Sequence, residues 1–174
     1  MDLKTKPIIV VSECLGFSAC RYDGGRSESR LVQELSPFVE FITVCPEVAI
    51  GLGTPRPPIW MVEQNGQQRL IQPETDRDLT GKMEQFAEKF LNDLSLVDGF
   101  ILKSRSPSCG INDCKLLDSP DNTEAPIGKT RGCFAACVQD KFKDLPIESE
   151  ASLKDDEIRQ RFLQKVFARA IERM

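Results

Sequence analysis

Three cysteines and one polar loop are the residues of this chain best suited to chemistry. Residues 103–110 combine three serines, a proline, Cys109 and a glycine directly after a short apolar run. Cys14 and Cys45 also follow short apolar runs. Loops at the ends of buried strands are common positions for binding and catalytic residues. We therefore expect the three loops to meet at one site.

The first of the apolar runs, residues 7–11, does not alternate with polar residues, which favours a buried parallel strand. Four strands are predicted: residues 7–11, 38–44, 97–103 and 145–148. Four helices are predicted: one from a cap at Ser27 or Ser29 to residue 35, one from a cap at Thr75 or Asp76 to residue 94, and two more over residues 131–142 and 155–173. The alternation predicts one α/β domain over residues 1–174, with a mainly parallel sheet flanked by helices.

Ligands of such sheets bind beyond the carboxyl ends of the strands. Cys14, Cys45 and Cys109 each lie shortly after a strand end, so their thiols are expected at the same edge. A β-hairpin insertion is expected near residues 59–71, because Asn65-Gly66 separates two extended runs. Residues 111–130 are expected to be loop-like.

The composition excludes several classes of function. The net charge is −4 and no basic block occurs, so nucleic acid is not expected as the main partner. No apolar run approaches the length of a membrane span. The first seven residues do not resemble a signal peptide, and we expect a reducing cytoplasm.

The counts of cysteine and histidine narrow the chemistry further. The chain has seven cysteines and no histidine. An odd number of cysteines argues against a closed disulfide framework. The lack of histidine excludes Ser-His and Cys-His catalytic pairs and every zinc site that needs imidazole.

A metal–thiolate site is the functional interpretation of the three loop cysteines, and burial as small hydrophobic residues is the alternative. Three thiolates would leave one coordination position open, and soft thiolates select zinc, copper(I) or iron–sulfur clusters. Cys20 is a candidate fourth ligand or a rival third one. Cys133 and Cys137 share a face of a predicted helix, where we expect core packing.

The remaining candidates are polar. Glu47 lies two residues after Cys45 and is suited to general acid/base work, with a solvated loop position as the alternative. Without histidine, a serine is expected to act as a hydrogen-bond donor or proton relay. Arg21 and Asp23 are expected to pair with each other or to orient a ligand. Arg56 lies between prolines, where we expect a surface arginine.

Several ordered blocks of the sequence form a specific pattern: SECLG at residues 12–16, RYDGG at 21–25, VCPEV at 44–48, GLGTPRPP at 51–58 and SPSCG at 106–110. In this order the blocks resemble a bacterial family that includes the thiouracil desulfidases. The resemblance implies a [4Fe-4S] cluster held by Cys14, Cys45 and Cys109, with one iron not ligated by the protein. It implies a non-redox reaction that removes the sulfur of a small thiolated nucleobase or nucleoside as sulfide.

The same resemblance assigns roles to other residues. It implies that Glu47 is the catalytic acid/base and that Ser106 is the catalytic serine, with Ser104 as the rival. Arg21 and Asp23 are the expected substrate-binding residues. Iron–sulfur assembly proteins are the expected protein partners.

Two other classes of function stay open from the sequence. One is a non-catalytic iron–sulfur, zinc or sulfur-carrying module that tolerates changes at Glu47 and Ser106. The other is a thiol redox sensor, which predicts a disulfide between Cys14 and Cys20.

Overall fold

A parallel sheet of four strands forms the central layer of the protein, in the order β2-β1-β6-β9. The computed structural model describes residues 5–173, so the start of the segment assessed for a signal peptide lies outside the described residues. The four strands are β1 (Ile8–Ser12), β2 (Glu40–Val44), β6 (Gly99–Leu102) and β9 (Ile147–Ser149). All four were predicted within a few residues, and β9 lies at the edge of the sheet as expected.

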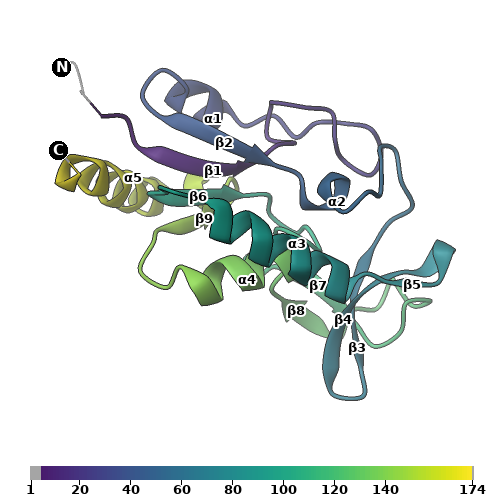
Figure 1. Cartoon of the computed structure of the whole chain (residues 1–174). Coiled ribbons are helices and arrows are strands. Elements are labelled where there is room, and N and C mark those ends of the chain that lie inside the picture. The colour runs from purple at the N-terminus through teal and green to yellow at the C-terminus, as the bar shows by residue number, and fades with distance from the viewer. Residues whose placement is uncertain (1–4, 174) are drawn as a thin grey trace.

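Helices cover both faces of this sheet (Figure 1). They are α1 (Arg30–Leu35), α3 (Thr80–Asp93), α4 (Cys133–Lys141) and α5 (Asp156–Glu172). Ile9 and Val11 pack against α1 and α5, whereas Val10 packs against α3 and α4, because successive side chains of a strand point to opposite faces. The predicted α/β sheet flanked by helices is confirmed. Among residues 5–173, no helix combines the length and apolar character that crossing a membrane requires.

Helix starts show where local signals suffice and where they fail. Ser29 caps α1, since its Oγ accepts a hydrogen bond from the Val32 amide at 3.4 Å. The predicted cap of α3 at Thr75 or Asp76 was wrong, because α3 begins at Thr80. The residues before it are used in a 3-10 turn, η1 (Pro73–Thr75), and in a further strand, β5 (Arg77–Asp78).

The predicted hairpin is confirmed but belongs to a second, larger sheet. Strands β3 (Trp60–Gln64) and β4 (Gln67–Gln72) pair antiparallel around Asn65-Gly66. The sheet has the order β5-β4-β3-β7-β8 and adds β7 (Cys114–Leu117) and β8 (Gly128–Thr130). The expectation that residues 111–130 form a loop was therefore wrong for β7 and β8 and holds for residues 118–127 between them. These strands are only four and three residues long. β7 pairs with β3, which is remote in sequence, and β8 pairs with β7.

Candidate active site

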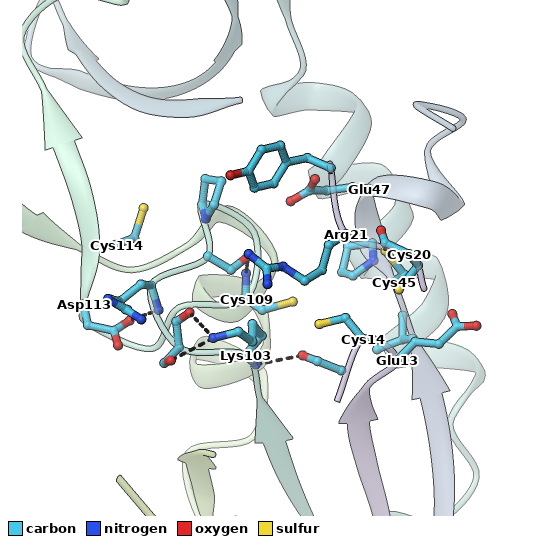
Figure 2. Close-up of a pocket in the computed structure, with 18 of the residues that line it drawn as sticks. Glu13, Cys14, Cys20, Arg21, Cys45, Glu47, Lys103, Cys109, Asp113 and Cys114 are labelled. Carbon is cyan, nitrogen blue, oxygen red and sulfur yellow. Dashed lines mark hydrogen bonds between the residues drawn. The ribbon is translucent and has the colours of Figure 1, made fainter. Parts of the chain in front are cut away.

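The three loop cysteines meet at the carboxyl edge of the parallel sheet. Strands β2, β1 and β6 are neighbours, and Ser12 is in register with Val44, so β1 and β2 end side by side. Cys14, Cys45 and Cys109 all border one cavity of about 420 Å³. In Figure 2 the sulfur atoms of Cys14 and Cys109 point toward the same space. The predicted meeting of the three loops is confirmed.

The segment after β2 brings a carboxylate to this cavity. Cys45 precedes the short helix α2 (Pro46–Ala49), and Pro46 occupies its first position, where the ring pre-sets a helical φ. The helical turn leaves Glu47 facing inward, with the residue only 8% exposed. Glu47 also lines the cavity, so the carboxylate and the thiols share one space.

The loop that carries Cys109 is fastened to the N-terminus of α4. The Cys133 amide donates to the Pro107 carbonyl and the Ala135 amide to the Ser108 carbonyl, both at 2.9 Å. These bonds satisfy amides that have no partner inside the helix. A Cβ on Gly132 would lie 2.5 Å from the Ser108 carbonyl carbon, so only glycine allows this approach. The loop is therefore held rigidly against the helix.

The serines of the loop have distinct partners. The Ser106 Oγ accepts hydrogen bonds from the Ser108 amide at 3.1 Å and the Cys109 amide at 3.0 Å. A hydroxyl has two lone pairs and one hydrogen, so the Ser106 hydroxyl hydrogen stays free to donate into the cavity that the residue lines. The Ser104 Oγ instead donates to the Glu150 carboxylate at 2.7 Å. The two serines thus differ in what they can offer to a ligand.

Glu47 is held by two residues that the sequence had not linked to it. The Arg56 Nε donates to Glu47 Oε2 at 2.7 Å, and the Ser108 Oγ donates to Glu47 Oε1 at 2.8 Å. Arg56 is only 8% exposed, so the expectation of a surface arginine was wrong. The prolines around Arg56 indicate a stiff loop, but they do not reveal which part of the protein this loop packs against.

A second, largely buried ion pair lies beside the cavity, which Lys103 lines and Glu150 does not. The Lys103 Nζ donates to Glu150 Oε1 at 2.6 Å, and the Ser104 amide donates to Glu150 Oε2 at 2.7 Å. Burial alone raises the pKa of Glu150, but the hydrogen bonds from Lys103 and Ser104 outweigh it and hold that pKa below its usual range. Glu150 follows β9, and no sequence motif connected it with this site.

The two expected substrate-binding residues take different positions. Arg21 lines the cavity and reaches in toward its centre (Figure 2), whereas Asp23 is not among the lining residues. The Arg21 Nη2 lies 3.8 Å from Asp23 Oδ2. Their pairing was one of the predicted alternatives. The aromatic residues Tyr22 and Trp60 also line the cavity.

The electrostatics of the thiols favour a positively charged occupant. Burial, followed by the nearby Cys45 thiol, raises the pKa of Cys14 to about 11. Burial also raises the pKa of Cys109, with smaller contributions from Cys14, Glu47 and Cys45, while a hydrogen bond with Ser12 lowers it. A bound cation would offset both effects and stabilise the thiolates.

The arrangement of the thiols fits a polynuclear group. Among the described residues, no set of three or more cysteine, aspartate and glutamate side chains is grouped to hold a single metal ion. The three loop cysteines instead border a cavity from different strands. In a [4Fe-4S] cluster each thiolate binds a different iron, so the ligands need not converge on one point. The donor set therefore fits a cluster.

The other cysteines differ in how close they lie to this site. Cys20 borders the cavity, and the Cys45 Sγ lies 3.8 Å from the Cys20 carbonyl oxygen as a weak donor. Burial and the neighbouring Cys45 raise the pKa of Cys20 to about 12. Cys133 and Cys137 pack in or against the core, as predicted.

Fold and site together define an α/β protein whose parallel sheet presents three thiols and a carboxylate to one cavity at its carboxyl edge. A family model described as 2-thiouracil desulfurase matches residues 9–150. The chain belongs to this family, and the resemblance noted from the sequence is confirmed.

Two similar proteins support this assignment. "Uncharacterized protein YbbK" of Bacillus subtilis (strain 168) is 33% identical over 110 residues, which cover 59% of this chain and 73% of that protein. A solved structure of the [4Fe-4S]-dependent thiouracil desulfidase TudS is 28% identical and has a TM-score of 0.66. The match covers 91% of this chain and 99% of that one, so the likeness extends over nearly the whole fold.

Proposed function

We propose that this protein is a [4Fe-4S]-dependent desulfidase that removes sulfur from small thiolated pyrimidines such as 2-thiouracil and releases it as sulfide. The observation that carries the proposal is one cavity bordered by three thiols from adjacent strand ends and by Glu47. Membership of the 2-thiouracil desulfurase family and the likeness to a [4Fe-4S]-dependent desulfidase support it.

Cys14, Cys45 and Cys109 would hold the cluster, and three protein ligands would leave one of its four irons free of the protein. When bound, the cluster would supply a Lewis-acidic iron that attracts a thiocarbonyl sulfur. The iron–sulfur assembly machinery would be the source of the cluster. The expected compartment is the reducing cytoplasm.

The net reaction exchanges the thiocarbonyl sulfur for the oxygen of water. A C=S group and one water give a C=O group and hydrogen sulfide, with no electrons gained or lost. Glu47 would accept a proton from the attacking water, since it lines the cavity and each of its oxygens has a lone pair left over from the bonds to Arg56 and Ser108.

Two further groups would handle the substrate. Ser106 would donate its hydroxyl hydrogen to the pyrimidine ring, because its lone pairs are already occupied by backbone amides. Arg21 would bind a polar atom of the substrate, and Asp23 would orient the Arg21 guanidinium. Neutral pyrimidines of this size fit a cavity that also presents Tyr22 and Trp60.

Anaerobic reconstitution tests the proposal directly. The wild-type protein should become brown, bind iron and sulfide, and release sulfide from 2-thiouracil. Cys45→Ser should lose both the colour and the activity, whereas the matched variant Cys137→Ser, which changes a thiol of the core region, should keep them. Cys20→Ser should also keep the cluster.

Three results would contradict the proposal. A colourless wild-type protein that binds zinc would favour a structural metal module. A cluster-loaded protein that releases no sulfide from thiolated pyrimidines would favour a non-catalytic role. A disulfide between Cys14 and Cys20, found by mass spectrometry of the oxidised protein, would favour a redox sensor.

A further inference from the structure

Arg56 is a buried cation that joins three loops around the site. Its side chain is 3% exposed, and its Nε donates to Glu47 Oε2 at 2.7 Å. Its Nη1 donates to the carbonyl oxygens of Cys20 at 2.9 Å and Gly53 at 2.8 Å. The Arg56 amide donates to the Tyr22 carbonyl at 2.9 Å. The guanidinium is thus fixed by the backbone of the site, and its Nε remains aimed at Glu47.

The second oxygen of Glu47 is fixed from a different element. The Ser108 Oγ donates to Oε1 at 2.8 Å, and Ser108 belongs to the loop that α4 holds in place. A glutamate side chain has several rotatable bonds, and ordering them costs conformational entropy. Here two donors from opposite sides select one orientation of the carboxylate before any ligand binds.

We propose that Arg56 is a positioning residue of the desulfidase reaction, which holds the Glu47 carboxylate in the orientation needed for proton transfer in the cavity. The inference rests on the proposed function. Arg56 is inferred to affect the reaction rate through Glu47. Its other hydrogen bonds reach backbone oxygens and Thr54 and do not reach the thiols. Small misplacements of a reacting group can cost large factors in rate.

Lysine cannot replace this arginine in both tasks. The Arg56 guanidinium donates to the Glu47 carboxylate through Nε and, at the same time, to the carbonyl oxygens of Cys20 and Gly53 through Nη1. A lysine ammonium is a single point of charge on a flexible stem. Arg56→Lys therefore keeps the charge while it loosens the orientation of Glu47.

A double-mutant cycle of Arg56 and Glu47 distinguishes two roles of Arg56: positioning the Glu47 carboxylate and stabilising the loops around the site. In cluster-loaded protein, Arg56→Lys should lower kcat for 2-thiouracil about 10- to 100-fold, with KM changed less than about 3-fold. In the Glu47→Gln background, the same change should alter the residual rate less than about 3-fold. Iron and sulfide content and the visible spectrum of Arg56→Lys should equal those of the wild type. The exposed Arg30→Lys is the matched control and should change nothing.

The outcomes distinguish the two proposals. A wild-type protein that releases no sulfide refutes the proposed function and this inference with it. An active wild type with an equally active Arg56→Lys refutes the inference alone. Equal losses of kcat in both Glu47 backgrounds, or loss of the cluster in Arg56→Lys, would make Arg56 a brace of the loops. Failure of both Arg56→Lys and Arg56→Gln to fold would have the same meaning.

Discussion

Glu47, which lines the cavity, and Glu150, which lies beside it, have the same side-chain exposure but different hydrogen-bond partners. The side chains of Glu47 and Glu150 are each 11% exposed, and each forms an ion pair with a buried or nearly buried cation. Glu150 accepts three hydrogen bonds from Lys103 and Ser104, whereas Glu47 accepts one on each oxygen. A carboxylate has about four lone-pair positions, so Glu47 keeps one more open acceptor position than Glu150. Burial and pairing alone would not tell the two apart.

The position of each pair in the fold explains the difference. Lys103 and Glu150 follow the adjacent strands β6 and β9, so their pair closes a gap between two neighbouring loops. Arg56 and Ser108 come from loops far apart in the sequence and reach Glu47 from separate elements. The Lys103–Glu150 pair is expected to stabilise the sheet edge, and the Arg56–Glu47 pair is expected to orient the carboxylate for the reaction.

The largest expected effect separates the two glutamates by rate. Glu47→Gln should lower kcat for 2-thiouracil by about 10²- to 10⁴-fold with the cluster retained, because the proton acceptor is lost. Glu150→Gln should lower kcat less than about 5-fold, since Glu150 has no role in proton transfer. Steady-state sulfide release by cluster-loaded proteins measures both. A larger loss in Glu150→Gln than in Glu47→Gln would reverse the comparison.

The next effect separates them by stability and pH. Glu150→Gln should lower the free energy of unfolding by about 3 kcal/mol at pH 7, because Lys103 is left without its partner. The pKa of Glu150 is depressed in the folded protein, so its contribution is present above the ordinary value of 4.5 and is lost as the pH falls through the folded value. Urea denaturation at several pH values should show that the difference in unfolding free energy between the wild type and the variant becomes smaller as the pH falls through the folded pKa of Glu150. A constant difference would contradict the assigned role of the carboxylate.

The smallest effect concerns the serines that serve each glutamate. Ser108→Ala removes one of the two donors to Glu47 and should lower kcat about 10-fold. Ser104→Ala removes a donor to Glu150 and should cost about 1 kcal/mol of stability, with kcat changed less than about 2-fold. Kinetics and thermal denaturation of the two variants sharpen the comparison. If Ser104→Ala loses activity to the extent of Ser106→Ala, Ser104 is the catalytic serine.

Much of the fold could be predicted because its signals are local. Short apolar runs marked β1, β2 and β6, and Asn65-Gly66 marked the β3–β4 hairpin. Strands β7 and β8 could not be predicted, because Cys-Lys-Leu-Leu and Gly-Lys-Thr have no distinctive pattern. β7 forms by pairing with the remote β3, and β8 then pairs with β7. The start of α3 was misplaced because residues 77–78 pair with β4 instead of entering the helix.

The sequence by itself determined which strand ends carry the thiols and which chemistry is open to a chain without histidine. That inference holds because parallel strands place their carboxyl ends at one edge whatever the rest of the chain does. Only the tertiary structure decided the partners of the carboxylates. Ser108 meets Glu47 across 61 residues and Ser104 meets Glu150 across 46, and such side-chain contacts leave no periodic trace in the sequence. The Glu47 contacts exist because α4 holds the loop of Ser108 and the loop of Arg56 reaches α2, so that each donor meets one oxygen of the carboxylate.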